Sequence, residues 1–182
     1  ASGLASKTFE DDRELRPTVQ VGNPFLEKIL IEACLEIASS DCIVGIQDLG
    51  AAGLVSSCVE SADRSGAGFE IDVANVPRRD KGLTPYEVML SESQERMIII
   101  VKKGHLEKAK NIFHKWGLTS TVIGKVTGNG LAKILENGET KGEIPVKLLT
   151  NPPLYKLNGI KPKWLSELQN FDLQNLPIPN KS

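Results

Sequence analysis

Residues 23–54 read NPFLEKILIEACLEIASSDCIVGIQDLGAAGL, and this stretch decides the fold. Asn23 followed by Pro24 is typical of an N-cap with proline at the first helical position, and apolar residues then recur at helical spacing as far as Ile37. The run from Cys42 to Ile46 is short, apolar and β-branched, which predicts a strand buried on both faces. A Gly/Ala-rich turn and a second helix-like segment follow. This order of elements is typical of an α/β domain.

Outward from this stretch, helix-like and strand-like segments continue to alternate. The pattern predicts helices over 53–62, 86–90 and 105–116, and strands over 69–73, 97–102, 120–126, 131–135 and 141–146. Glycine-containing turns connect the last strands as hairpins. We therefore expect an α/β (α+β) fold, a layered α/β/α sandwich with a mixed sheet.

The domain is expected to occupy residues 1–150, with the polar and acidic residues 1–18 as a lead-in. From Asn151 prolines interrupt the hydrophobic pattern, so residues 151–182 are expected to be a linker with one short helix around residues 164–168. The chain opens on a Gly/Ser/Ala segment without a methionine. We therefore expect a piece of a longer protein, with the linker leading to its second half.

The composition excludes several classes of protein. The chain has 182 residues, of which 40% are hydrophobic and 25% charged, as in one ordinary globular domain. A net charge of -1 and a pI near 6.2 give no bulk attraction to nucleic acid or to an anionic membrane. The most apolar run, Met97 to Val101, is too short to span a bilayer. No signal peptide is visible, so a cytoplasmic location with reduced cysteines is expected.

The turn at residues 48–53, DLGAAG, is the first candidate site. It follows the predicted strand of residues 42–46, at the edge where open α/β sheets place their ligands. Asp48 offers the carboxylate oxygen that a hard cation such as Mg²⁺ prefers, and the helix start that follows offers N–H groups to an anion. Alternatively, Asp48 caps the helix and the glycines serve packing, and the pattern alone leaves both interpretations open.

Residues 91–96, SESQER, form the second candidate site, because six polar residues stand directly before an apolar strand. Glu92, Ser93 and Gln94 supply carboxylate, hydroxyl and amide groups, the mixture that orients a polar ligand. The alternative is a solvated loop. The third candidate is Gln20, which presents its amide either to a ligand from a strand edge or to solvent from an alternating strand.

The two histidines do not form a site by sequence. His105 stands at a helix start and His114 in its last turn, and neither has a nucleophile or a metal partner nearby in the sequence. A structural or surface role is therefore predicted for both.

Three segments in this order resemble the phosphoribosylformylglycinamidine synthase family, whose synthetase subunit acts in purine biosynthesis. They are residues 19–25 (VQVGNPF), 47–54 (QDLGAAGL) and 83–97 (LTPYEVMLSESQERM). The likeness extends from about Thr18 to Val101 and more loosely to Thr150. The SESQERM string is the most specific part, whereas the Gly/Ala turn is shared more widely in the superfamily.

The resemblance implies the fold of an aminoimidazole ribonucleotide (AIR) synthase C-terminal domain, in the first such lobe of a longer enzyme. It also implies a reaction in which ATP and Mg²⁺ activate the amide oxygen of formylglycinamide ribonucleotide (FGAR), and ammonia then replaces that oxygen to give the amidine. The expected partners are FGAR, a glutaminase subunit and a small accessory subunit. The alternatives are a related synthetase resembling AIR synthetase, or a non-catalytic interaction module.

By the same resemblance, Gln20, Glu92, Ser93 and Gln94 should contact the substrate and Asp48 should bind Mg²⁺. The family's catalytic histidine and most of its ATP contacts belong to the preceding lobe. We therefore expect no catalytic residue in this chain and no activity from it alone. Asn23 and Leu49 stand where the family often has Asp and Met, and both departures leave the expected contacts intact.

Overall fold

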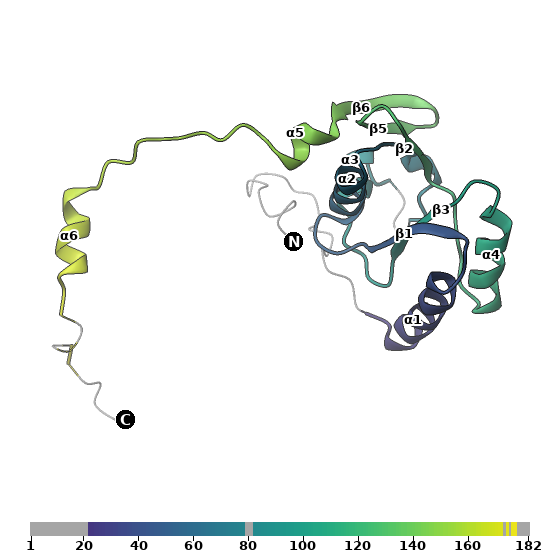
Figure 1. Cartoon of the computed structure of the whole chain (residues 1–182). Coiled ribbons are helices and arrows are strands. Elements are labelled where there is room, and N and C mark those ends of the chain that lie inside the picture. The colour runs from purple at the N-terminus through teal and green to yellow at the C-terminus, as the bar shows by residue number, and fades with distance from the viewer. Residues whose placement is uncertain (1–21, 79–81, 173, 175, 178–182) are drawn as a thin grey trace. The chain divides into compact units, whose positions relative to one another are not determined.

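A computed structural model describes residues 22–78, 82–172, 174, 176 and 177 of the chain (Figure 1). The chain divides into two compact units, residues 1–152 and 153–182. Gln20 lies outside the described residues.

Helix α1 (Pro24–Ala38) begins where the sequence predicts. The Asn23 side chain accepts a hydrogen bond from the Leu26 N–H at 3.1 Å, and Pro24 occupies the first helical position. Ala33 and Ile37 lie one turn apart and are fully buried against α4 (Leu106–Lys115). The predicted helix is confirmed, and its apolar stripe faces a second helix.

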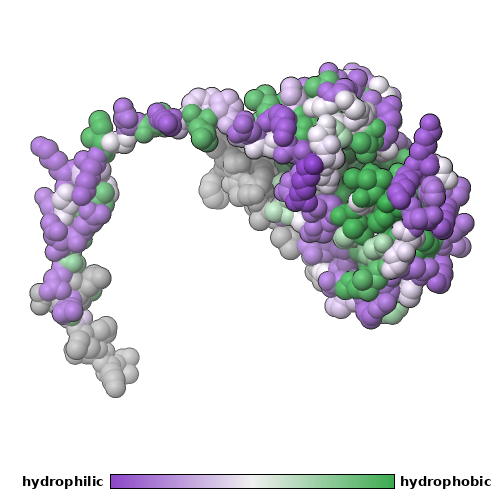
Figure 2. All heavy atoms as spheres, viewed as in Figure 1, coloured by the Kyte–Doolittle hydropathy of each residue, from purple (hydrophilic) through white to green (hydrophobic). Residues whose placement is uncertain are grey.

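Strand β1 (Ile43–Asp48) pairs antiparallel with β3 (Met97–Val101), and these two strands form a sheet of their own. The prediction of a strand buried on both faces is wrong, because Val44 is 71% exposed. A continuous β-branched run is typical of a central strand in a parallel sheet, but among the described residues β1 pairs with β3 alone. Figure 2 shows apolar side chains at the surface of this unit.

A second sheet has the strand order β4-β2-β5-β6. Its strands are β2 (Gly68–Asp72), β4 (Gly124–Thr127), β5 (Leu131–Glu136) and β6 (Glu139–Pro145). Strand β2 pairs parallel with β5 and antiparallel with β4, so the predicted mixed sheet is confirmed. The division of the strands into two sheets was not predicted.

The strand predicted over residues 120–126 begins only at Gly124. A β-carbon on Gly124 would lie 2.1 Å from the Glu70 carbonyl oxygen, so glycine is what lets this strand reach β2. The hydrophobic pattern shows no such close approach, which is why it misplaced the start of the strand.

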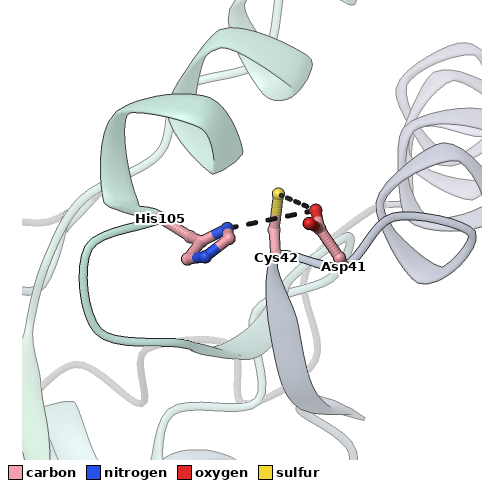
Figure 3. Close-up of side chains that lie close together, drawn as sticks. All are labelled: Asp41, Cys42 and His105. Atoms are coloured by element: carbon pink, nitrogen blue, oxygen red, sulfur yellow. Dashed lines mark hydrogen bonds and ion pairs between the residues drawn. The ribbon is translucent and has the colours of Figure 1, made fainter.

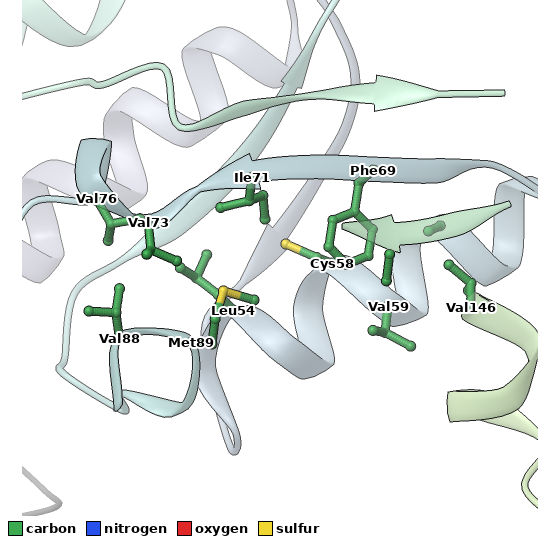
Figure 4. Close-up of a cluster of buried hydrophobic side chains, with 12 residues drawn as sticks. Leu54, Cys58, Val59, Phe69, Ile71, Val73, Val76, Val88, Met89 and Val146 are labelled. Carbon is green, nitrogen blue, oxygen red and sulfur yellow. The ribbon is translucent and has the colours of Figure 1, made fainter. Parts of the chain in front are cut away.

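The larger core lies between the second sheet and the helices α2 (Gly53–Ser65), α3 (Pro85–Leu90) and α5 (Val146–Thr150), with a 3-10 turn η1 (Val73–Asn75) after β2. Figure 4 shows Phe69 and Ile71 of β2 facing Leu54 and Cys58 of α2. Burial raises the pKa of the Cys58 thiol to about 11, so this cysteine stays protonated. A smaller core joins α1, α4 and β1. The predicted α+β fold is confirmed, whereas α5 was not predicted.

In the described part of the second unit, helix α6 (Lys163–Gln169) forms where the sequence predicts a short helix, and it has no buried residue. Among the residues that the structure describes, no helix has the length and apolar character needed to cross a membrane. Cys34, Cys42 and Cys58 are free thiols, as expected.

Candidate functional site

The Gly/Ala turn between β1 and α2 has an unusual backbone. Ala52 and Gly53 both adopt left-handed conformations, with φ of 59° and 53°. A β-carbon on Gly53 would lie 2.1 Å from the Ser91 carbonyl oxygen. The turn therefore packs backbone to backbone against the SESQER loop, so the DLGAAG and SESQER motifs meet here.

Glu92 strengthens this contact with its side chain. Its Oε1 accepts a hydrogen bond from the Ala52 N–H at 3.0 Å, and the two residues are 40 positions apart. The carboxylate thus occupies one of the N–H groups at the start of α2, where negative charge is favoured. The idea that this turn binds an anion is weakened accordingly, because a side chain of the chain itself takes that place.

Arg96 fixes the shape of the loop from within. Its guanidinium donates to the Ser93 carbonyl oxygen at 3.0 Å and to the Ser91 carbonyl oxygen at 2.5 Å. The Arg96 carbonyl oxygen accepts from the Leu49 N–H at 3.2 Å. Gln94 is exposed, and its Nε2 lies 3.4 Å from the Glu92 carbonyl oxygen. These hydrogen bonds give the loop a defined conformation.

Asp48 lies exposed at the end of β1, directly beside this loop. It pairs with Met97 of β3 in the sheet register, and its Oδ1 accepts from the Gln47 side-chain amide at 2.9 Å. Small residues follow at Gly50 and Ala51. A hydrated cation can therefore approach the carboxylate, and oxygen is the donor that Mg²⁺ prefers. Asp48 therefore fits the role of one carboxylate ligand of a magnesium ion.

The NPF segment at the start of α1 also contacts the SESQER loop, through Asn23. The Asn23 N–H donates to Glu95 Oε1 at 2.6 Å, across 72 positions of sequence. Gln20, three residues earlier, lies outside the described residues, so its expected contact stays a prediction. The structure therefore brings Asp48 together with Glu92, Ser93 and Gln94, and it ties the segment that follows Gln20 to them. The binding roles of these residues stay predictions.

Sequence reasoning missed two residues that hold this site together, Glu95 and Arg96. Both belong to the SESQER string, but their partners are backbone atoms of distant or looped segments. No spacing in the sequence reports such contacts. The left-handed backbone of Glu95, with φ of 54°, was also invisible in the sequence.

A second cluster, of Asp41, Cys42 and His105, lies at the junction of β1 and α4 (Figure 3). Their ligand atoms lie within 4.8 Å of one another, so His105 has neighbours that the sequence did not reveal. Lys108 Nζ already donates to Asp41 Oδ1 at 2.6 Å and thereby lowers the pKa of that carboxyl. Cys42 is fully buried. Because the Asp41 carboxylate is already paired with the Lys108 ammonium, we interpret the cluster as a contact between the start of β1 and the start of α4.

The family model described as AIR synthase related protein, C-terminal domain, matches residues 1–135. The chain belongs to this family. A relative from Moorella thermoacetica, phosphoribosylformylglycinamidine synthase subunit PurL, is 54% identical over 98% of the chain. That alignment covers 25% of the relative, so the chain spans about a quarter of the length of the curated relatives it matches.

Solved structures agree with this assignment. The chain is similar to Thermotoga maritima PurL complexed with FGAR, with a TM-score of 0.70 and 34% identity over 79% of this chain and 24% of that one. The chain is also similar to T. maritima PurL complexed with ATP, with a TM-score of 0.69 and 33% identity over 79% of this chain and 25% of that one. For PurLQS from the same organism the TM-score is 0.69, and the identity is 32% over 79% of this chain and 24% of that one. The family resemblance and the AIR synthase C-terminal fold expected from the sequence are both confirmed.

Proposed function

We propose that this chain is the substrate-holding lobe of a longer ATP-dependent synthetase that converts FGAR to its amidine, formylglycinamidine ribonucleotide. The observation that supports this most is the meeting of three motifs at one rim, with Asn23 bound to Glu95 and Ala52 bound to Glu92. A PurL relative from Moorella thermoacetica is 54% identical over 98% of the chain, and T. maritima PurL has been solved with FGAR and with ATP. ATP is the proposed co-substrate here.

In this proposal the chain itself orients the reactants. Gln20, Glu92, Ser93 and Gln94 hold polar groups of FGAR, and the packed turn at Gly53 keeps the Glu92–Gln94 loop rigid while they do so. Rigid polar contacts supply most of what a phosphoryl-activation step needs, because positioning and charge neutralisation dominate such reactions. The groups that transfer protons belong to another part of the synthetase, so this chain alone is proposed to be inactive.

Asp48 is proposed to hold Mg²⁺, with substrate oxygens completing the coordination. When bound, the ion supplies charge neutralisation at the phosphates of ATP. The exposed carboxylate of Asp48 supplies the negative oxygen that a divalent cation favours.

Ammonia is proposed to come from a separate glutaminase subunit, helped by a small accessory subunit. The similarity to PurLQS of T. maritima supports an assembly of this kind. Small molecules and proteins, rather than nucleic acid or a membrane, are the proposed partners. The cytoplasmic location expected from the sequence stays a prediction.

Asp48→Asn in the complete synthetase tests the proposal. The change keeps the size of the side chain but removes the charge that holds the cation. Outer partners of metal ligands already cost about 10 to 100-fold when removed, so amidine formation at limiting Mg²⁺ should fall by at least about 100-fold, with partial recovery at high Mg²⁺. Glu60→Gln, an exposed carboxylate on α2, is the control. Turnover of Asp48→Asn near that of the wild type would refute the assignment.

Calorimetric titration of the complete synthetase with FGAR distinguishes this proposal from the alternative of a non-catalytic interaction module. FGAR titrated into the complete synthetase should release or absorb heat in a saturable way. A complete protein that binds no FGAR but holds a stable protein partner would favour the non-catalytic alternative instead.

A further inference from the structure

The start of helix α1 lacks one group that usually completes a capped helix. In a capping box, the third residue of the helix is Glu or Gln, and its side chain accepts the N–H of the N-cap residue. Helix α3 has this arrangement, since Glu87 Oε2 accepts the Thr84 N–H at 2.8 Å. In α1 the corresponding residue is Leu26, whose side chain cannot accept a hydrogen bond. Glu95 fills that place from 72 positions away.

Glu95 Oε1 lies close to both Asn23 and Gly22 at the start of α1. Glu95 Oε1 lies 2.6 Å from the Asn23 nitrogen, and a β-carbon on Gly22 would lie 3.3 Å from the same oxygen. Asn23 is held again by its own side chain, which accepts the Leu26 N–H at 3.1 Å. Asn23 is therefore held both by Glu95 and by the first turn of its own helix.

Glu95 also adopts a backbone conformation that side chains rarely take. Its φ is 54°, and the other non-glycine residues of the described chain with positive φ are Ala52, in the facing turn, and Asn137, in a hairpin. Asparagine tolerates this region, whereas glutamate does so at a cost in energy. Such residues persist where the surroundings hold them, and they cluster at functional sites. Here the left-handed backbone accompanies the turn of the carboxylate toward α1.

We propose that Glu95 is a positioning residue that caps α1 in place of a local glutamate. It thereby holds Asn23, and with it the start of α1, beside the loop of Glu92, Ser93 and Gln94. The effect on substrate binding rests on the function proposed above, whereas the cap itself does not. Glu95 acts through Asn23 and touches no substrate in this account.

The test compares Glu95→Ala, Glu95→Gln and a matched control in the complete synthetase. Asp72 is the control, because its carboxylate also accepts distant backbone N–H groups, at 3.0 Å from Asn137 and 2.9 Å from Gly138, but at a hairpin of the other sheet. Calorimetry measures the affinity for FGAR, urea unfolding measures stability, and amide exchange reports on the Asn23 N–H.

Glu95→Ala should weaken FGAR binding at least tenfold and make the Asn23 N–H exchange faster. Glu95→Gln should stay within about threefold of the wild type, because the amide oxygen still accepts that N–H. Asp72→Ala should lose stability and keep its affinity for FGAR. Each of these three results supports a positioning role.

Three results would overturn the proposal: wild-type FGAR affinity in Glu95→Ala, equal losses in Glu95→Ala and Glu95→Gln, or equal losses in Glu95→Ala and Asp72→Ala. The second would assign a direct role to the charge, and the third a merely structural role. If the wild type binds no FGAR, the proposed function fails by itself. Amide exchange at Asn23 then decides the cap, which is refuted if Glu95→Ala leaves that exchange unchanged.

Discussion

At the scale of single residues, Gly53 has no room for a β-carbon. Its φ of 53° lies in the left-handed region, and the added atom would stand 2.1 Å from the Ser91 carbonyl oxygen, within the backbone of the facing loop. Gly66, at the other end of α2, has a similar φ of 67° but faces open space. The two glycines separate the cost of backbone conformation from the cost of crowding.

Gly66→Ala should therefore lower the free energy of unfolding by about 1 kcal/mol, from the left-handed backbone alone. Gly53→Ala should lower it by about 3 kcal/mol or more, because overpacking against the loop adds to the same backbone cost. Urea unfolding of the two variants checks this difference. Equal losses would mean that the turn and the loop do not press on each other.

The roles of single residues divide into those that sequence can and cannot predict. Asp48 and Glu92 were predicted as site residues because their types and their place in known motifs carry information. In the structure Glu92 accepts a hydrogen bond from Ala52, in the turn that follows Asp48, and the binding roles of both carboxylates stay predictions. Glu95 and Arg96 act on backbone atoms, and any residue supplies a backbone N–H or carbonyl. Their partners therefore leave no trace in the sequence.

At the scale of elements, α1 and α4 are joined by a small network of polar contacts. Glu36 of α1 accepts from the Lys115 ammonium at 2.8 Å and from the Trp116 indole N–H at 2.8 Å. The hydrogen bonds from Lys115 and then from Trp116 lower the pKa of Glu36 below its ordinary value. The network is therefore complete when Glu36 is ionised.

The lowered pKa fixes how the stability should depend on pH. The stabilisation by ionised Glu36 is fully present above the ordinary glutamate pKa of about 4.3 and is lost as the pH falls through the lower pKa of the folded state. Glu36→Gln keeps an acceptor but does not titrate. The stability difference between wild type and variant should be constant from pH 7 to 5 and shrink toward pH 3. Urea unfolding at these pH values measures it, and a difference independent of pH would contradict the contact.

Element boundaries were predictable where their signals are local. Helix α1 begins at an Asn-Pro pair and α2 ends before a glycine, and both were found close to their places. Strand β1 was predicted with the wrong burial, because its apolar run does not reveal how many neighbours a strand has. Strand β4 was predicted to start at residue 120, whereas it begins at Gly124.

At the scale of the whole molecule, the buried residues of both cores lie between Ala33 and Val146. Residues 153–182 form a separate unit with α6, and their role as a linker stays a prediction. Alternation of helices and strands predicted the α+β class, but strands of similar composition went to two sheets. Which strands pair depends on contacts across the chain, such as β1 with β3, that no local pattern records.

The function proposed above depends on one binding rim formed by the start of α1 at Asn23 and by residues 48–53 and 91–96. Hydrogen exchange of the complete synthetase, followed by mass spectrometry with and without FGAR, measures all three at once. If the rim binds FGAR, we expect FGAR to slow hydrogen exchange in the three segments together and to leave the exchange rate of the β5–β6 hairpin unchanged. Slowed exchange in a single segment, or in the hairpin instead, would contradict it.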